Sequence, residues 1–598
     1  MKEEETMIKK YIKNIIAACS VCCCLTTVFT ACSDSHMQEV NTDDSKAASI
    51  EPSAQLTTAL LQTYGDFSMM DTYRCYITGF TQHFAGGWNV TAHAGSVYYY
   101  DDYSSAEWKE LYSVGIKNIV DAIANSVDKP NTNAALRIQR VLLMSILTDT
   151  YGDVPCSEAG LGYISGITTP VYDKQEDIYN FFFEELAACV AQLGTGNDNI
   201  NGDVTSLAGD INGWKRYANS LRLRFAMRIS DVEEEKAKAE FQKALTAEGG
   251  YITSTDQDAY VIYTDGPFTL YDGAADLDFR VNALGEMLYG QDPTSPTLIC
   301  STFFNIMKDT NDPRLYRICR HYLNTKRTDK EADREWTVDV TDEVVDYLNR
   351  SGEVEQPNNP GAAWYNDWVN APANKEIPTL ERLVEQYPDA GFDGNNFPAR
   401  MMRPWLSIDF EMPDRPGALI NYAEVEFLLA EAALKKWIDS DTKEAHFKNA
   451  VTASIAWLNN HYLQPSMRIT DNEVEAFLNG PIADKFKESD EGAKEAINTQ
   501  AWILHMMNPS EAWANMRRSD YPVIMNRTLL PKFDGFTYGS DLRTPTRLCY
   551  PKSEEQYNNK NYNEALKRMG SYNEHNEPVD DWHAHVWWDR HDYHVNKQ

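Results

Sequence analysis

Two stretches of the chain combine aromatic and amide side chains in a pattern typical of sugar-binding surfaces. A flat aromatic ring can cover the apolar C–H face of a sugar, while asparagine or aspartate bonds its hydroxyl groups. Both stretches lie in Gly- or Asn-rich sequence without a helical stripe, which favours exposed rings. The candidate residues are Trp88, Asn89, Tyr98 and Tyr99 in the first stretch, and Trp364, Asn366 and Trp368 in the second. The competing interpretation is that these rings pack loops onto the scaffold.

Metal binding is a second chemistry that the residue types allow. Near the end of the chain, His583, His585, His591 and His594 stand among several aspartates, a mixture that can bind zinc. Their spacing matches no known zinc signature, and we therefore expect no metal site there. An acidic loop from Asp265 to Asp278 is the better candidate for a calcium ion, which would have a structural role. We expect no other cofactor.

Catalysis is the third chemistry to consider. Glycoside hydrolysis needs two carboxylates beside a cleft. Because the chain has 89 acidic residues, some pair could always be found, and such a pair is no evidence for hydrolase activity. The sequence contains no G-x-S-x-G, H-E-x-x-H or P-loop motif. We therefore expect a binding protein without catalytic residues.

The N-terminal segment has the layout of a lipoprotein signal. Lys9, Lys10 and Lys13 precede an uncharged run at 15–31, which is shorter than a membrane span of about 20 residues. Cys32 follows Thr-Ala, as in the bacterial lipobox, where cleavage leaves a diacylated N-terminal cysteine. An ordinary secretory signal with an incidental cysteine is the alternative. We expect acyl chains such as palmitate on Cys32 to anchor the chain to a membrane.

The composition limits the partners and the redox state. A formal net charge of −34 argues against binding nucleic acid or anionic lipid headgroups, because a negative field repels polyanions. Six of the 11 cysteines lie beyond Cys32, and they form no C-x-x-C pair. We expect buried free thiols, with a Cys300–Cys319 bridge as the alternative.

Helical periodicity dominates the chain after the first 50 residues. Apolar residues recur at spacings of three and four in segments that follow one another in pairs with short connections. These segments are 134–151, 176–193, 214–229, 234–247, 420–436, 443–463 and 491–507. The pattern predicts a mostly-α fold of TPR-like stacked helical hairpins, although no clean 34-residue repeat is present.

The composition also predicts the domain organisation. We expect a signal peptide at 1–31, a flexible tether at 32–50 and a single large domain at 51–598. Within that domain, a helical scaffold would occupy about 51–255 and 415–530. A loop-rich insert at about 256–414, punctuated by Gly, Pro, Asn and Asp, would carry the binding surface. The last segment, about 531–598, lacks helical periodicity and is predicted to be irregular.

Six local motifs occur in the order typical of one known family. One of them, Tyr151-Gly152-Asp153-Val154-Pro155, ends a helix in a glycine turn that a proline prevents from resuming. The motifs lie at 147–155, 214–224, 311–314, 422–432, 511–518 and 547–563. With the Cys32 segment, they make the chain resemble the SusD/RagB family, the nutrient-binding outer membrane lipoproteins of the Bacteroidetes. Charged residues in these motifs are expected to pair across the helical core, with ligand contact as the alternative: Arg222, Arg224, Asp153 and Glu431.

The resemblance implies a location and a role. Such a protein stands on the cell surface, attached to the outer membrane by its lipid alone. It captures an oligosaccharide without altering it and passes it to a TonB-dependent transporter of the SusC type, over which it sits as a lid. A peptide or glycopeptide ligand is the alternative within this class, because aromatic residues alone do not separate the two. A structural lid subunit without a ligand of its own is the alternative from another class.

Overall fold

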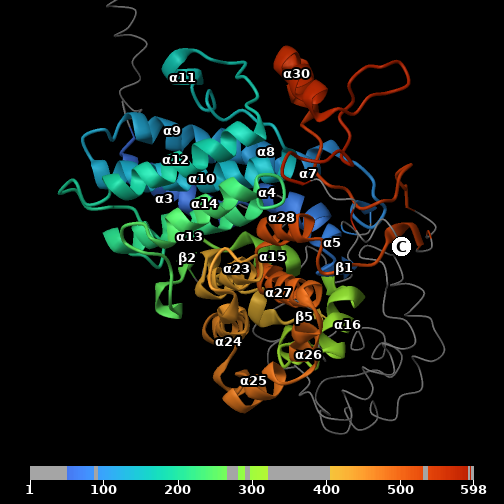
Figure 1. The fold of residues 1–598 in the computed structure, drawn as a ribbon. Coiled ribbons are helices and arrows are strands. Elements are labelled where there is room, and N and C mark those ends of the chain that lie inside the picture. Colours follow the sequence, from blue (N-terminus) through green and yellow to red (C-terminus); the bar gives the residue numbers. More distant parts are fainter. Residues whose placement is uncertain are drawn as a thin grey trace, which may run out of the picture. The chain divides into compact units, whose positions relative to one another are not determined.

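The structure is a computed structural model, which describes residues 50–86, 90, 92–264, 280–289, 297–320, 405–529, 532, 536–589 and 593. The described residues from Pro52 onward belong to one compact unit. Helices make up most of the regular structure in the described part of the chain, and the strands are short (Figure 1). The predicted mostly-α class is confirmed.

The first group of helices packs in pairs around the start of the domain. α3 packs on α9, and α4 packs on α8. The Asp66 side chain begins α4 by accepting a hydrogen bond from the Met69 N–H at 3.1 Å. The group comprises α3 (Pro52–Gly65), α4 (Phe67–Thr72), the π-helical turn η1 (Tyr73–Ile77), α5 (Thr78–Phe80), α7 (Asp101–Ser104), α8 (Ala106–Glu110), the π-helical turn η2 (Leu111–Ile116) and α9 (Lys117–Ala124).

The next helices stack one on another as successive hairpins, the TPR-like arrangement that the periodicity predicted. α10 packs on α12, α12 on α13, and α13 on α14. Pro130 occupies the first turn of α10, and Gly152 ends that helix with φ of 92°, which glycine adopts without strain. The helices are α10 (Pro130–Tyr151), α11 (Gly162–Ser165), α12 (Gln175–Gln192), α13 (Ile211–Arg228) and α14 (Glu234–Leu245).

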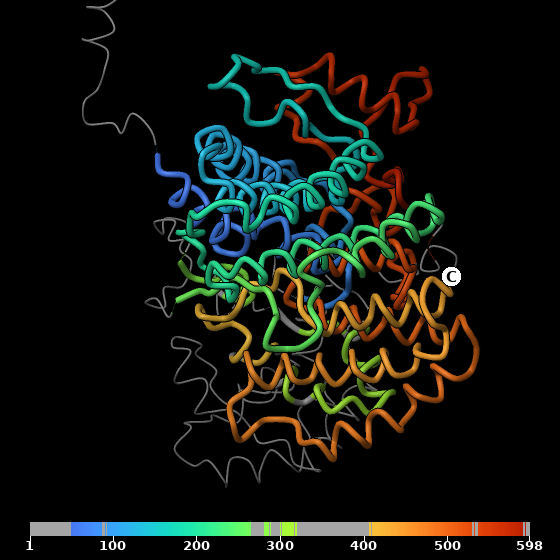
Figure 2. The backbone as a smooth tube through the Cα atoms, turned by 60° about the vertical axis from the view of Figure 1, so that its left-hand side comes forward, coloured from blue at the N-terminus to red at the C-terminus, as the bar shows by residue number. Residues whose placement is uncertain are grey.

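A second helical layer forms from the chain after residue 421. Its helix α23 packs on α24 and α27 and also on α13, so it joins the two helical groups (Figure 2). Side-chain caps set the helix starts: Asn421 accepts from the Glu424 N–H, and Thr470 with Glu473 forms a capping box. The layer contains α23 (Tyr422–Leu434), α24 (Lys443–His461), α25 (Asp471–Leu478), α26 (Pro481–Glu488), α27 (Asp490–Leu504) and α28 (Pro509–Ser519).

Short strands and helices occupy the described parts of the chain between the two layers, and one further strand, β1, lies in the first helical group between α5 and α7. One antiparallel sheet has the strand order β1-β3-β5-β4, and its register pairs Phe84 with Ile299 and Cys319 with Leu406. A second pairs β2 with β6. The elements are β1 (Phe84–Gly86), β2 (Ala259–Val261), α15 (Ala283–Tyr289), β3 (Thr297–Ile299), α16 (Ser301–Asp309), α17 (Leu315–Ile318), β4 (Cys319–Arg320), β5 (Trp405–Leu406) and β6 (Gly417–Ile420).

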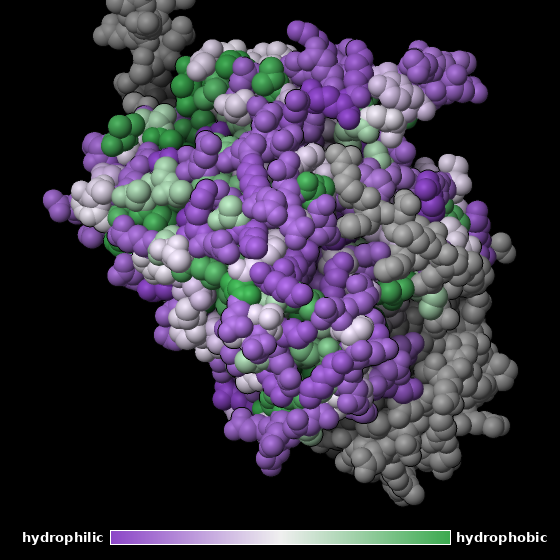
Figure 3. All heavy atoms as spheres, viewed as in Figure 1, coloured by the Kyte–Doolittle hydropathy of each residue, from purple (hydrophilic) through white to green (hydrophobic). Residues whose placement is uncertain are grey.

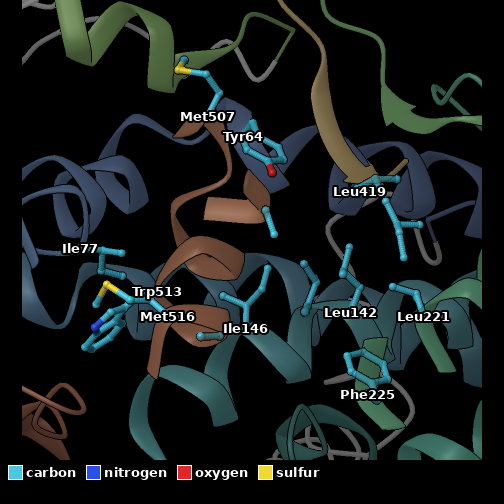
Figure 4. Packing of buried hydrophobic residues seen from close by; sticks show 14 of the residues in the cluster. Tyr64, Ile77, Leu142, Ile146, Leu221, Phe225, Leu419, Met507, Trp513 and Met516 are labelled. Atoms are coloured by element: carbon cyan, nitrogen blue, oxygen red, sulfur yellow. The ribbon is translucent and has the colours of Figure 1, made fainter. Parts of the chain in front are cut away.

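One apolar core runs through both helical groups. Figure 4 shows part of this core. Trp513 of α28 lies near Ile77, Leu142 and Ile146 lie along α10, and Phe225 comes from α13. All five side chains are buried. Large apolar side chains of this kind each stabilise the fold by roughly 1.5–3 kcal/mol when fully buried.

Buried ion pairs cross this core and join α13, α23 and α28. The Arg224 guanidinium binds Glu424 through Nε at 2.5 Å and Nη2 at 2.7 Å. The Arg518 guanidinium binds both oxygens of Glu431 at 2.7 Å. The side chains of both pairs are at most 5% exposed. A buried charge is tolerated only when it is partnered, which explains why the family-like motifs carry these residues.

The other two motif charges that we expected to pair also have partners. Arg222 lies 3.7 Å from Glu240, and Asp153 lies 2.5 Å from Arg568. The structure therefore gives all four motif charges an ion pair within the protein. The Asp153 pair stands apart from the helical core, at the end of α10, and it borders a cavity of about 250 Å³.

The C-terminal segment differs from the sequence-based expectation of an irregular stretch. It contains α29 (Lys552–Tyr557) and α30 (Asn559–Met569). The pattern was missed because α30 buries only Tyr562, Ala565 and Leu566, which make too narrow a stripe to stand out among Asn, Lys and Glu. Asn561 Nδ2 donates to the Thr169 and Pro170 carbonyl oxygens, so α30 lies beside the loop that carries α11 (Figure 1).

The six cysteines beyond Cys32 are free thiols in the structure, and five of them are buried. Burial raises the pKa of Cys75, Cys156 and Cys189 to about 12, so these thiols stay protonated at neutral pH. Cys300 and Cys319, the alternative bridge, are both buried and unbonded to each other.

The surface is polar over most of the face seen in Figure 1, with scattered apolar patches (Figure 3). None of the helices in the described residues is both long enough and apolar enough to cross a membrane.

Candidate functional site

A cavity of about 650 Å³ lies between the segment that follows Ser96 and the C-terminal part of the chain. Ligand pockets typically measure about 300 to 1,000 Å³. We call this site the aromatic cavity. Its lining joins rings with charged side chains: Tyr98, Tyr99, Tyr538, Tyr562 and Trp582 with Asp541, Lys552, Glu555, Asp581 and His583.

The two walls of the aromatic cavity meet at Gly539. Its N–H donates to the Ser96 carbonyl oxygen at 3.0 Å. A Cβ at this position would lie 2.1 Å from the Val97 carbonyl oxygen, so the close approach requires glycine. Val97 has φ of 46°, a left-handed conformation that directs the chain into Tyr98 and Tyr99. The backbone therefore fixes where these two tyrosines stand.

The aromatic wall has an exposed part and a buried part. Tyr98 is 38% exposed, and its ring borders the cavity. The half-buried Tyr99 ring meets Trp582 edge to face, with centroids 5.9 Å apart and an interplanar angle of 87°. Trp582 is buried and also packs edge to face on Tyr76 and Phe80, which fixes the base of the wall in the core. Tyr98 thus offers the ring face that a ligand can cover.

The opposite wall presents carboxylates held by a histidine and an arginine. His583 Nδ1 lies 3.4 Å from Asp581 Oδ1 and 3.8 Å from Asp541 Oδ2. His583 hydrogen-bonds to Asp581 and so holds the pKa of that carboxyl below its ordinary value. Burial alone would raise the pKa of Asp541, but its hydrogen bonds to Arg543 lower it. Both carboxylates are therefore ionised acceptors at neutral pH, suited to ligand hydroxyl or amino groups.

A buried arginine supports this wall from behind. Arg547 binds the Asp580 carboxylate, donates to the Tyr151 carbonyl oxygen at 3.1 Å, and stacks 4.5 Å from the centre of the Tyr550 ring. Burial raises the pKa of Asp580 even though Arg547 is bound to it. Because Arg547 belongs to the last of the family-like motifs, that motif forms the rear of the cavity.

Asp101 joins the two walls of the cavity. One of its oxygens accepts hydrogen bonds from the Tyr99 hydroxyl at 2.7 Å and from the Lys552 N–H at 3.0 Å. The Lys552 ammonium lies 5.9 Å from the centre of the Tyr99 ring. Lys552 and Glu555 are exposed on α29, so the lining carries both a cation and an anion. The site therefore combines ring faces, donors and acceptors.

The structure brings two of the predicted site residues into this cavity. Tyr98 and Tyr99 line it side by side. The other candidates of the first stretch, Trp88 and Asn89, lie outside the described residues. The candidates of the second stretch, Trp364, Asn366 and Trp368, lie outside them too, and all five stay predictions.

The rest of the lining comes from the C-terminal part of the chain, where the sequence pattern predicted no ligand contacts. Tyr538, Tyr562 and Trp582 supply rings from the C-terminal segment, and Asp541 and Asp581 supply carboxylates. The abundance of Tyr, Asn and His in this segment was a usable signal. It could not show that the segment folds back onto Tyr98 and Tyr99.

One cluster of possible metal ligands occurs among the described residues. Ligand atoms of Glu424, His505 and Glu511 all lie within 4.8 Å of one another. Each carboxylate already binds an arginine: Arg224 holds Glu424, and Arg228 holds Glu511 at 2.6 Å. Burial lowers the pKa of His505. Two guanidinium groups supply the positive charge that a cation would bring, so we interpret the cluster as an ion-pair network.

Of the histidines and the acidic loop that the sequence offers as possible metal ligands, the structure describes two histidines and leaves the others outside the described residues. His583 Nε2 bonds the Arg543 carbonyl oxygen at 3.0 Å and so has a partner within the protein, whereas His585 Nδ1 lies 3.6 Å from Asp589, beyond hydrogen-bond distance. His591, His594 and the acidic loop from Asp265 to Asp278 lie outside the described residues, and the calcium site stays a prediction.

Comparisons with known proteins agree with this architecture. The family model described as "SusD-like_2: Starch-binding associating with outer membrane" matches residues 44–364, more than half of the chain. A second, described as "Susd and RagB outer membrane lipoprotein", matches residues 394–589. The chain therefore belongs to the SusD/RagB family of outer membrane lipoproteins. No curated protein matches it.

Solved structures of similar proteins cover nearly the whole chain. A SusD-like protein described as Bacteroidetes AC2a is 35% identical, with a TM-score of 0.77 over 91% of this chain and 100% of its own. A chitin-binding protein is 28% identical, with a TM-score of 0.67 over 90% of this chain and 100% of its own. A SusD homologue from Bacteroides uniformis is 20% identical and has the same fold. Its TM-score is 0.64, and the match covers 90% of this chain and 99% of its own.

Proposed function

We propose that this outer membrane lipoprotein binds an oligosaccharide in the aromatic cavity and delivers it to a SusC-like TonB-dependent transporter. The observation that carries the proposal is the pairing of the exposed Tyr98 ring with the ionised carboxylates of Asp541 and Asp581 around one cavity. A ring covers the apolar face of a sugar, and carboxylates accept its hydroxyl hydrogen bonds.

In this role the protein binds the sugar and does not alter it chemically. Affinity would come from ring stacking and from hydroxyl hydrogen bonds, and the intact sugar would be released to the transporter. The similar chitin-binding protein makes oligomers of N-acetylglucosamine the first probes, and the starch-binding description of the family makes malto-oligosaccharides the second. A peptide or glycopeptide is the alternative ligand, because the mixed charges of Lys552 and Glu555 would also suit it.

Removing the exposed ring is expected to weaken glycan binding. Tyr98→Ala should reduce the affinity for the best oligosaccharide about tenfold, because losing one stacked aromatic contact costs on the order of 1–2 kcal/mol. Isothermal titration calorimetry with chitohexaose, maltohexaose and a panel of peptides measures this effect on the chain without residues 1–31.

The matched control is Tyr557→Ala, which removes a tyrosine that is 78% exposed and absent from the cavity lining. Its affinity should equal that of the unmodified protein. An affinity for the sugar that does not change in Tyr98→Ala would place the binding site elsewhere. Binding of peptides alone would replace the glycan assignment, and binding of neither would favour a structural lid subunit.

Loss of the acylated cysteine is expected to release the protein from the membrane. Cys32→Ala removes the thiol that the lipid requires, so the chain should leave the membrane fraction, and labelling with radioactive palmitate should stop. Retention of Cys32→Ala in membranes, with undiminished labelling, would reject this attachment site.

The transporter partner is tested separately. A tagged protein extracted from outer membranes in mild detergent should carry a large TonB-dependent transporter with it. Its isolation without any such protein would contradict the delivery step, and it would leave the sugar-binding proposal intact.

A further inference from the structure

A second cavity lies along the same C-terminal segment. Asp580 to His583 line the aromatic cavity, whereas His585 to Trp587, a few residues further on, line a cavity of about 250 Å³. Its other walls come from the Tyr-Gly-Asp turn at the end of α10, the first residues of α12 and the last residues of α30. The family-like turn motif therefore borders a cavity that the proposed binding site does not use.

The turn holds an arginine at the edge of this cavity. Arg568 Nε lies 2.5 Å from Asp153 Oδ2, and Arg568 Nη2 donates to the Tyr172 carbonyl oxygen at 2.9 Å. The other Asp153 oxygen accepts from the Gln175 N–H at 2.9 Å. The Arg568 side chain remains 31% exposed although both contacts fix it. A fixed, partly exposed guanidinium can donate to a ligand without first losing side-chain entropy.

The remaining lining supplies a ring and both kinds of polar group. Trp587 is half-buried, with its ring centre 6.1 Å from that of Tyr179. Lys174 and Glu176 flank the start of α12, and neither has an ion-pair partner within 4 Å among the residues that the structure describes. The charges of Lys174 and Arg568 balance those of Asp153 and Glu176. Such a lining suits an uncharged ligand rich in hydroxyl groups.

We propose that this second cavity is an additional subsite for one neutral sugar unit, stacked on Trp587 and hydrogen-bonded by Lys174, Arg568 and Glu176. The volume of about 250 Å³ lies just below the usual range for ligand pockets, which limits the occupant to a small group. The proposal deepens the proposed function and rests on it, because both sites would take the same class of ligand.

A buried tyrosine connects the two sites. The Tyr550 hydroxyl donates to the Asp153 carbonyl oxygen at 2.7 Å, beside the second cavity. The Tyr550 ring lies 5.9 Å from that of Tyr562, which lines the aromatic cavity as Tyr550 itself does. The two cavities thus share structural walls while presenting different side chains.

Counting bound sugars tests the second subsite. Isothermal titration calorimetry with the disaccharides chitobiose and maltose should give two molecules per chain for the unmodified protein with the sugar that binds. Trp587→Ala should reduce the count to one, and Tyr98→Ala should weaken the other site about tenfold. Lys174→Ala, a change at an exposed residue that leaves the core intact, should weaken one of the two sites about fivefold, the effect of one hydrogen bond.

The outcomes separate this inference from the proposed function. The control Tyr557→Ala should retain two sites of unchanged affinity. One molecule per chain, bound about tenfold more weakly in Tyr98→Ala and unaffected by Trp587→Ala and Lys174→Ala, would overturn the second subsite and leave the proposed function standing. Absence of binding by either disaccharide and by the longer oligomers would overturn both.

Discussion

Glu431→Ala is expected to lower the free energy of unfolding by about 3 to 5 kcal/mol, the cost of leaving a buried charge without its partner. Arg518 binds both Glu431 oxygens at 2.7 Å, and Asn498 adds a contact at 3.3 Å. Burial alone would raise the pKa of the Glu431 carboxyl, but the Arg518 guanidinium holds it below its ordinary value. Urea unfolding followed by circular dichroism at neutral pH measures the loss.

Two further variants show whether the loss comes from the orphaned charge. Glu431→Leu combined with Arg518→Met replaces the pair by apolar groups and should recover most of the lost stability. Glu444→Ala removes the partner of Lys448 in a pair whose side chains are about 40% exposed, and it should cost less than about 1 kcal/mol. Equal losses for Glu431→Ala and Glu444→Ala would show that the buried network does not stabilise the fold.

Glu107→Gln is expected to stabilise the protein above pH 7, by up to about 3 kcal/mol, because a tenfold change in a proton-binding constant corresponds to about 1.36 kcal/mol. Burial raises the pKa of the Glu107 carboxyl from 4.5 to about 7, against the lowering effect of the Thr150 and Tyr73 hydroxyls. Between these two values the folded state binds more protons than the unfolded state, so stability falls as the pH rises from about 4.5 to about 7.

The measurement compares urea unfolding of the two proteins from pH 4 to pH 8. The stability difference should be smallest near pH 4, should grow with pH and should level off above pH 7. Glu235→Gln, at an exposed position of α14, controls for the charge change and should show no such growth. A Glu107→Gln curve that stays parallel to that of the unmodified protein would show that the pKa of Glu107 does not change on folding.

The helical scaffold could be predicted because its information is local. The predicted segment 134–151 became α10 at Pro130–Tyr151, and 176–193 became α12 at Gln175–Gln192, so for these two segments the errors lie at the helix ends. Those ends depend on caps such as Asp210, which begins α13 by accepting from the Gly213 N–H at 2.7 Å. A cap is a single residue, whereas a stripe extends over several turns, and only the stripe is visible as periodicity.

The site could be predicted in part. Tyr98 and Tyr99 stood out by their composition, and both line the aromatic cavity. Trp582 and Asp541 did not, because nothing in a local window shows that they face the two tyrosines. That contact depends on Gly539 approaching Val97 and on Asp101 binding Lys552, which are single long-range contacts without a repeating pattern.

The hydrogen bond between Asp101 and Lys552 links positions 451 residues apart, so the aromatic cavity is among the most non-local features of the fold. Contacts of such high sequence separation form only after the intervening chain has been ordered, because loop closure must first be offset by other contacts. A chain that has lost its last 50 residues would retain Tyr98 and Asp541 but lack the part of the opposing wall that contains Asp581, Trp582 and His583. Ligand binding at this cavity would therefore report that folding is complete.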